Sequence, residues 1–119
     1  MRNLIKNTFS DYDGNVIELS AEILFKFKNL VAEIKNILNC NTEIVNGDLD
    51  ELDENTYVKG VNFNHGEIII IDNITIHDAF TYGLIDSLKE TICHEIAHNK
   101  YWNHSRWHKE LTRHYFELV

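Results

Sequence analysis

The sequence predicts an α+β fold made of one helix, a three-stranded sheet with a hairpin, and two further helices. Apolar residues recur at helical spacing near both ends of the chain, which indicates amphipathic helices. The run Ile68–Ile71 has the length and composition of a buried strand, and Asn64-His65-Gly66 just before it is typical of a hairpin turn. A chain of 119 residues, 44% of them hydrophobic, is long enough for a single domain with its own core.

The N-terminal third is expected to hold a loose arm followed by a long helix. The arm covers residues 1–14 and ends in the turn signal Asp11-Tyr12-Asp13-Gly14. The helix covers residues 15–38, with Asn15 and Glu18 at the spacing of a capping box. Its predicted buried face consists of Ile23, Phe27, Leu30, Ile34, Ile37 and Leu38.

Three short strands are predicted in the middle of the chain. Residues 42–45 are rich in β-branched side chains, and residues 57–63 and 67–71 flank the hairpin turn. We choose residues 67–71 as the candidate for an open edge strand, which would bind an extended peptide by main-chain hydrogen bonds. A central strand suits the same apolar run equally well. The acidic segment 47–55 is expected to be a solvated loop, with an ion- or substrate-binding role as the alternative, although it lacks the spacing of an EF-hand.

Two helices are expected in the C-terminal part. The first runs through residues 79–92 and into the segment that follows, with Thr75 or Asp78 as its N-cap. Its buried stripe is predicted to consist of Phe80, Leu84, Leu88, Ile92 and Ile96, which recur every four residues. Residues 105–118 are predicted to form a closing helix. The side chains expected to pack this last helix are Trp107, Leu111 and Leu118.

The most informative feature is His94-Glu95-Ile96-Ala97-His98, followed six residues later by His104. Histidines four apart lie on one face of a helix, so both imidazoles can reach one zinc ion at roughly 2.0–2.1 Å. Glu95 lies about 100° around the helix, close enough to contact a metal-bound water without being a ligand. His104 would be the third ligand and leave the fourth position open. The pattern predicts a catalytic Zn²⁺ site in which the metal acidifies a water and Glu95 takes its proton.

Other interpretations of these residues stay open. The histidines could be solvated or hydrogen-bonded structural residues, and Glu117 could replace His104 as the third ligand. A hydrolase also needs a donor for the oxyanion of its tetrahedral intermediate. The candidates for this contact, or for contact with substrate, are Tyr101, Arg106, His108 and His114.

The composition narrows the classes of function. A formal net charge of −8 argues against a general nucleic-acid-binding surface. The acidity is uneven, because residues 91–119 carry four lysines and arginines against three glutamates. No segment resembles a signal peptide or has the length of a membrane span, and Cys40 and Cys93 match neither a metal knuckle nor a disulfide framework. We therefore expect a cytoplasmic protein with no membrane partner.

The run from Ile92 to Ser105, ICHEIAHNKYWNHS, resembles the minimal zincin metallopeptidases of the WLM, SprT-like and YgjP-like families. WLM proteins commonly show His-Glu-Leu-Ala-His-Asn with a third histidine at the offset of His104. YgjP-like proteins often end this stretch in Asn-His-Ser, as here. The upstream order of helix and hairpin is similar too, so the resemblance implies a zincin-like metallopeptidase domain over residues 15–119.

This resemblance implies a zinc-dependent endopeptidase that acts on protein or peptide substrates. His94, His98 and His104 would bind zinc, and Glu95 would be the general base. WLM and SprT-like enzymes are associated with degrading proteins bound or crosslinked to DNA, so single-stranded DNA or a DNA-bound protein is the implied partner. The chain departs from the families at His108, where an aromatic residue is usual. We expect the neighbouring Trp107 to take the packing role and His108 to line the cleft.

Two rival functions are weighed against this one. A bacterial endoribonuclease family that processes ribosomal RNA has three histidines at the same spacing, but typically has glycine at the position of Glu95. A non-catalytic module would keep zinc as a structural element, with a fourth protein ligand in place of water. The presence of Glu95 favours the peptidase over both.

Overall fold

The sheet of this molecule has three strands in the order β3-β5-β4. β3 (Glu43–Gly47) runs parallel to β5 (Ile68–Asp72), and β4 (Gly60–Phe63) runs antiparallel to β5. The structure, a computed structural model, describes residues 3–11, 13–52 and 58–119. The predicted α+β class and the β4–β5 hairpin are confirmed. The choice of residues 67–71 as an edge strand is wrong, because β5 is central and the outer strands of this sheet among the described residues are β3 and β4.

Each face of β5 packs on a different group of apolar residues. Ile69 and Ile71 face the main core, which α1, α2 and α3 share. Ile68 and Ile70 face a second cluster on the opposite side, together with Leu4 and Leu49. All four isoleucines are therefore buried, as expected for a central strand with both faces covered. The side chains that complete the main core include Phe27, Val31, Ile34, Ile76, Leu88, Ile92 and Ile96.

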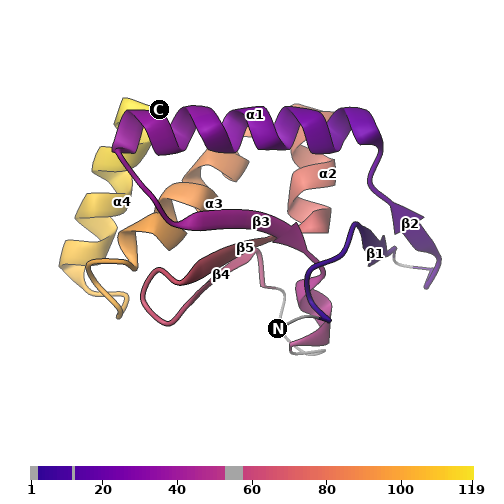
Figure 1. Cartoon of the computed structure of the whole chain (residues 1–119), viewed down its shortest axis with the longest axis horizontal. Coiled ribbons are helices and arrows are strands. Elements are labelled where there is room, and N and C mark those ends of the chain that lie inside the picture. Colours follow the sequence, from indigo (N-terminus) through magenta and orange to yellow (C-terminus); the bar gives the residue numbers. More distant parts are fainter. Residues whose placement is uncertain (1–2, 12, 53–57) are drawn as a thin grey trace.

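The first helix, α1 (Ala21–Leu38), begins six residues later than predicted. Ser20 is its N-cap and accepts a hydrogen bond from the backbone N–H of Ile23. The predicted capping box at Asn15 and Glu18 is wrong, because residues 16–18 pair with another strand instead of entering the helix. Figure 1 shows α1 running along one side of the molecule, over the other helices and the sheet.

The expected N-terminal arm is not loose. β1 (Thr8–Ser10) pairs antiparallel with β2 (Val16–Glu18), and between them the backbone N–H of Gly14 donates to the carbonyl of Asp11. Leu4 and Phe9 are buried in the two apolar clusters. The amide of the buried Asn73 also donates to the backbone carbonyls of Lys6 and Thr8, which ties this segment to the start of α2.

The single helix predicted ahead of the motif is two helices. α2 (Asn73–Tyr82) ends at Gly83, whose φ of 73° is left-handed, and α3 (Ile85–Ala97) begins two residues later. Asp72 precedes α2 as its N-cap residue, in place of Thr75 or Asp78. The predicted stripe holds for Leu88, Ile92 and Ile96. It fails at Leu84, which is 51% exposed because the break turns it to solvent.

The closing helix, α4 (Arg106–Leu118), begins after the N-cap Ser105 as predicted, but with a different buried face. Trp107 is 59% exposed, Leu118 is also exposed, and Leu111 is half-buried. The buried residues of α4 are His108 and Thr112. The packing role predicted for Trp107 is therefore wrong, and His108 fills that position. No helix of the described residues is long and apolar enough to cross a bilayer.

The acidic segment is more ordered than a solvated loop. Residues 49–51 form the short 3-10 helix η1 (Leu49–Glu51), and both Asp48 and Leu49 are buried. The backbone N–H of Leu49 donates to Asp72 Oδ1 at the end of β5. The part of this segment from residue 53 to 55 lies outside the described residues.

Candidate metal centre

The two motif histidines lie at the C-terminal end of α3, which is held by buried residues on its opposite side. Leu88, Ile92 and Ile96 fix this helix in the main core. His94 and His98 then project from the other face, one turn apart, with ring centroids 4.8 Å apart. Both imidazoles therefore face the same small volume, which is the arrangement that their spacing in the sequence predicts.

His104 lies beside this pair, as predicted. Its Nε2 is 3.3 Å from Nε2 of His94, and its ring centroid is 4.9 Å from that of His98. Two nitrogens bound to one tetrahedral zinc ion at roughly 2.05 Å are about 3.3–3.4 Å apart. The separation between His94 and His104 therefore fits two ligands of a single ion.

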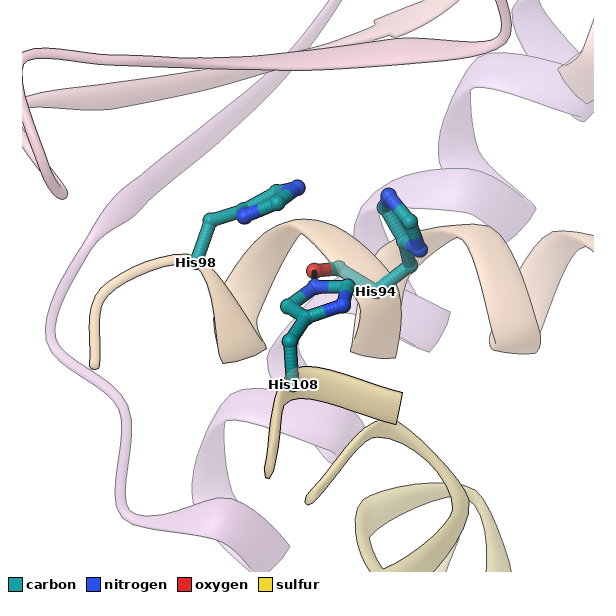
Figure 2. A group of neighbouring side chains, drawn as sticks. All are labelled: His94, His98 and His108. Carbon is teal, nitrogen blue, oxygen red and sulfur yellow. Dashed lines mark hydrogen bonds between the residues drawn. The ribbon is translucent and has the colours of Figure 1, made fainter. Parts of the chain in front are cut away.

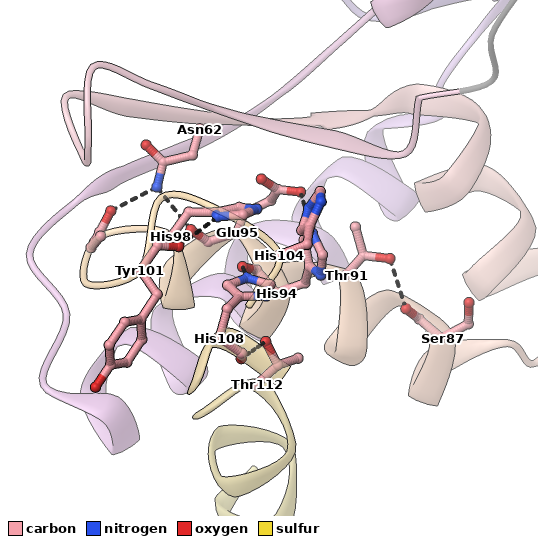
Figure 3. A network of polar contacts seen from close by, with 11 residues as sticks. Asn62, Ser87, Thr91, His94, Glu95, His98, Tyr101, His104, His108 and Thr112 are labelled. Atoms are coloured by element: carbon pink, nitrogen blue, oxygen red, sulfur yellow. Dashed lines mark hydrogen bonds and ion pairs between the residues drawn. The ribbon is translucent and has the colours of Figure 1, made fainter. Parts of the chain in front are cut away.

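A backbone hydrogen bond fixes the orientation of the His98 ring. Its Nδ1 donates to the carbonyl oxygen of Tyr101 at 2.9 Å, in the turn after α3. The proton then sits on Nδ1, and Nε2 keeps its lone pair for a metal. Carbonyl partners of this kind commonly orient metal-binding histidines. Figure 3 shows that the side chain of Tyr101 points away from the histidines, so only its backbone serves the site.

His108 brings a fourth imidazole to the site from α4. Its Nε2 donates to the backbone carbonyl of His94 at 3.0 Å, and its ring stacks on that of His98 with centroids 4.0 Å apart. Figure 2 shows His108 on α4 pointing toward His94 and His98. The side chain is 1% exposed, and its Nδ1 has no hydrogen-bond partner among the described residues. We call His94, His98, His104 and His108 the histidine cluster.

The ligand atoms of His94, His98 and His108 all lie within 4.8 Å of one another, so this group could hold a metal ion. The rings of His98 and His108 also stack, with their planes at 19°. Stacking of this kind and the hydrogen bond from His108 to the His94 carbonyl are packing contacts, which favour a positioning role for His108.

Burial keeps His94 and His98 in the form that binds metals. It lowers the pKa of His94 from 6.5 to about 4, and the neighbouring imidazoles lower it further in the same direction. The pKa of His98 is also lowered, again chiefly by burial. Neutral imidazole is the metal-binding form, because protonation removes the lone pair. These donors, neutral at pH 7, fit a zinc ion.

Glu95 lies next to the cluster without joining it. Its Oε2 is 3.9 Å from Nε2 of His94, and burial raises its pKa from 4.5 to about 7. The side chain is 8% exposed, and a Cβ at Gly60 on β4 would lie 3.1 Å from its Cγ. A carboxyl group with a pKa near neutrality can both take and return a proton, as a general base must.

The hairpin β4–β5 is fastened to the end of α3 by Asn62. Its amide donates to the backbone carbonyl of Glu95 at 2.8 Å and to Oδ1 of Asn99 at 2.7 Å. Its own Oδ1 accepts from the backbone N–H of Gly66 in the hairpin turn. Three hydrogen bonds on one buried side chain thus hold the outer strand β4 beside Glu95 (Figure 3).

Two cavities meet at His94. The first, about 560 Å³, is lined by Glu90, His94, His104, His108, Lys109, Thr112, Arg113 and Phe116. The second, about 310 Å³, lies between β4 and α3 and is lined by Lys59, Gly60, Ser87, Glu90, Thr91, His94 and Glu95. His94 borders both cavities, His104 borders the first, and Glu95 borders the second.

The remaining candidates from the sequence lie elsewhere. Arg106 is exposed and pairs with Glu110, while His114 is exposed and contacts Tyr115. Glu117 is exposed near the end of α4. None of these three residues lines either cavity. Lys109, Arg113 and Asn62 border the site but were not predicted from the sequence. Lys109 and Arg113 are four residues apart on α4, next to His108, and this spacing was the signal that could have revealed them.

A family model for the WLM domain matches residues 17–116, which is most of the chain. WLM domains are metalloprotease-like domains associated with zinc. No curated protein and no solved structure matches this chain.

Proposed function

This chain belongs to the WLM domain family, and we propose that it is a zinc-dependent endopeptidase. The observation that carries the proposal is the juxtaposition of the histidine cluster with Glu95, whose carboxylate is 3.9 Å from His94 and has a pKa near 7. That arrangement has the parts that metal-assisted hydrolysis requires: nitrogen ligands, a general base and access for substrate.

His94, His98 and His104 would hold the zinc ion, with His108 as a positioning residue beneath them. His104 is supported by its 3.3 Å separation from His94. His108 instead uses its Nε2 on the carbonyl of His94 and stacks on His98, which keeps both rings in place. It thereby fills the position where the resembling families usually have an aromatic residue.

Zinc, when bound, supplies a Lewis acid that lowers the pKa of a water molecule and polarises a carbonyl group. Glu95 takes the proton from the attacking water and passes it to the leaving amine. Its burial helps in both directions, because a pKa of about 7 leaves the group partly ionised at neutral pH. Asn62 and the close approach of Gly60 set the position of this carboxylate relative to the cluster.

We propose that substrates bind as extended peptides along the open edge of β4. This strand borders the cavity that contains Glu95, and its register with β5 leaves the opposite edge without a strand partner among the described residues. Main-chain hydrogen bonds along such an edge accept many sequences. The cavities on either side of His94 would receive the side chains that flank the scissile bond.

DNA-bound proteins are the substrate class that we propose within this function. Lys109 and Arg113 line the larger cavity, and the guanidinium of Arg106 lies 5.6 Å from the ring centroid of the exposed Trp107. Basic and aromatic side chains on one helix suit a single-stranded nucleic acid. They stand in the least acidic part of a chain with a net charge of −8.

The test is cleavage of an unfolded protein by zinc-loaded protein, with and without single-stranded DNA, against Glu95→Gln. We expect cleavage that falls about 10²–10⁴-fold in the variant, which keeps its zinc because Glu95 is not a ligand. Zinc content by atomic absorption is the control for that retention. Stimulation by DNA would support the DNA-bound substrate.

Two outcomes would overturn the peptidase. Cleavage of RNA in place of protein would assign the site to a nuclease. Absence of any cleavage, with zinc held by four protein ligands in the absorption spectrum of a cobalt-substituted sample, would assign a structural role to the metal.

A further inference from the structure

A second group of metal-binding side chains lies at the other end of β5, outside the histidine cluster. Asp48, Asp50 and Asp72 each offer a carboxylate oxygen, and these oxygens all lie within 4.8 Å of one another. We call these three residues the acidic cluster. Asp48 is the N-cap of η1, Asp50 lies within η1, and Asp72 ends β5. The contact between η1 and β5 therefore creates the group.

Asp72 is the unusual member of the acidic cluster. The residue is 0% exposed, and its Oδ1 accepts a hydrogen bond from the backbone N–H of Leu49 at 3.0 Å. Its Oδ2 is buried and has no hydrogen-bond partner among the described residues. A buried carboxylate oxygen without a partner is costly, so such a group holds either a proton or a cation.

The neighbouring residues make a cation a suitable partner for that oxygen. Asp48 is 8% exposed and Asp50 is half-buried, so this is not a set of solvated surface carboxylates. Their negative charges add to the burial of Asp72 in opposing its ionisation, and its pKa rises to about 7. A divalent ion would neutralise the mutual repulsion and occupy the free Oδ2.

We propose that Asp48, Asp50 and Asp72 form a binding site for a hard divalent cation, Ca²⁺ in particular. Carboxylate oxygens are the ligands such cations prefer. Calcium–oxygen distances are roughly 2.3–2.6 Å, so one Ca²⁺ can reach oxygens that all lie within 4.8 Å of one another. The acidic segment 47–55, which was expected to be a solvated loop, would thus supply two of the three carboxylates that bind the cation.

The bound cation would join three parts of the fold. Asp48 donates its backbone N–H to the carbonyl of Leu4, and Asn73, next to Asp72, donates to Lys6 and Thr8. A cation in the acidic cluster would therefore hold η1 and the N-terminal segment against the end of β5. Because the cluster is separate from the histidine cluster, this proposal stands or falls independently of the peptidase.

The experiment is a thermal unfolding series of the full chain at pH 8, where Asp72 is ionised, with its zinc supplied in stoichiometric amount. CaCl₂ or MgCl₂ is added, and calorimetric titration gives the stoichiometry. We expect one Ca²⁺ per chain and a Tm rise of roughly 5–10 °C when calcium is about 100-fold above its dissociation constant. Asp72→Asn and Asp50→Asn should each abolish the rise, while Asp13→Asn, an exposed aspartate outside the cluster, should keep it.

Three results would overturn the proposal. No response of Tm or heat to either cation would mean that Asp72 holds a proton instead. A full calcium response in Asp50→Asn would place the ion elsewhere, and this variant decides the matter if Asp72→Asn does not fold. A response to Mg²⁺ with none to Ca²⁺ would overturn the assignment of calcium.

Discussion

The histidine cluster and the acidic cluster are built from opposite chemistry but meet the same physical condition. Each contains a titratable side chain that burial drives toward its neutral form, His94 in the first and Asp72 in the second. For His94 that form is the metal-binding imidazole, with a pKa of about 4. For Asp72 it is the carboxylic acid, with a pKa of about 7. Burial thus prepares the first cluster for a metal, while the second must lose a proton before it can bind one.

The two clusters also differ in how the chain assembles them. Three of the four histidines follow one another within eleven residues, on α3 and the turn after it. The acidic cluster brings η1 onto the end of β5, elements that are distant in the sequence. Spacing along the sequence is therefore enough to find the histidine cluster, whereas the acidic cluster can be found only from strand pairing and packing.

The largest effect that separates ligands from positioning residues concerns His104 and His108. We expect His104→Ala to lower zinc affinity about 10³-fold or more, because a ligand is lost. His108→Phe should lower it about 10–100-fold, because an aromatic ring keeps the stack on His98 and loses only the hydrogen bond to His94. Competition with a chromogenic chelator measures both. The reverse order would make His108 the third ligand.

Asp72→Asn tests how much an ionised Asp72 lowers the free energy of unfolding when no cation is bound. The folded pKa of about 7 lies above the unfolded value of 3.8, so the folded state binds the extra proton between those values. The contribution of Asp72 to stability therefore falls as pH rises from 4 to 7. We expect the variant to equal wild type below pH 4 and to exceed it by roughly 4 kcal/mol above pH 7, at 1.36 kcal/mol per pKa unit.

Urea unfolding across this pH range, in buffer with chelator, gives the difference between the two proteins. Taking that difference removes the contributions of His94 and Glu95, which both proteins share. A constant difference across the range would contradict the raised pKa of Asp72. The exposed Asp13→Asn should show no such trend, since it removes a solvated carboxylate.

Asn62→Ala tests how the sheet is joined to the metal centre. It removes hydrogen bonds to the Glu95 carbonyl, to Asn99 and from Gly66, so we expect a loss of about 1–3 kcal/mol in stability. The rate of cleavage should fall by a larger factor than zinc affinity, because β4 is no longer held in position beside Glu95. Asn41→Ala, at an exposed site, is the control. An unchanged kcat would show that the β4 edge does not position the substrate.

The smallest effect is expected from Gly60→Ala. The added Cβ would lie 3.1 Å from Glu95 Cγ and 3.3 Å from Thr91 Cγ2, so the carboxylate must shift by a few tenths of an ångström. We expect kcat to fall about tenfold, since small displacements of a catalytic group are costly. Zinc content should not change. A kcat equal to that of wild type would mean that Glu95 tolerates movement.

The sequence by itself determined the features that depend on neighbours along the chain. Helical periodicity placed His94 and His98 on one face, and the spacing to His104 placed a third imidazole beside His94. The hairpin turn at Asn64-His65-Gly66 has positive φ at all three residues, as its composition indicates. The WLM resemblance, drawn from the same short motif, agrees with the family match over residues 17–116.

Tertiary structure decided which residues pack against each face of a helix or strand, and sequence periodicity does not contain this information. An apolar stripe on residues 79–96 did not show that Gly83 would divide the helix, and an amphipathic α4 did not show that His108 would be buried in preference to Trp107. β5 is central because β3 and β4 pair with its two edges, and it is buried on both faces because Leu4 and Leu49 cover the second one. Asp72 meets Asp48 and Asp50 for the same reason: contacts between distant segments are set by packing, and local sequence carries little information about them.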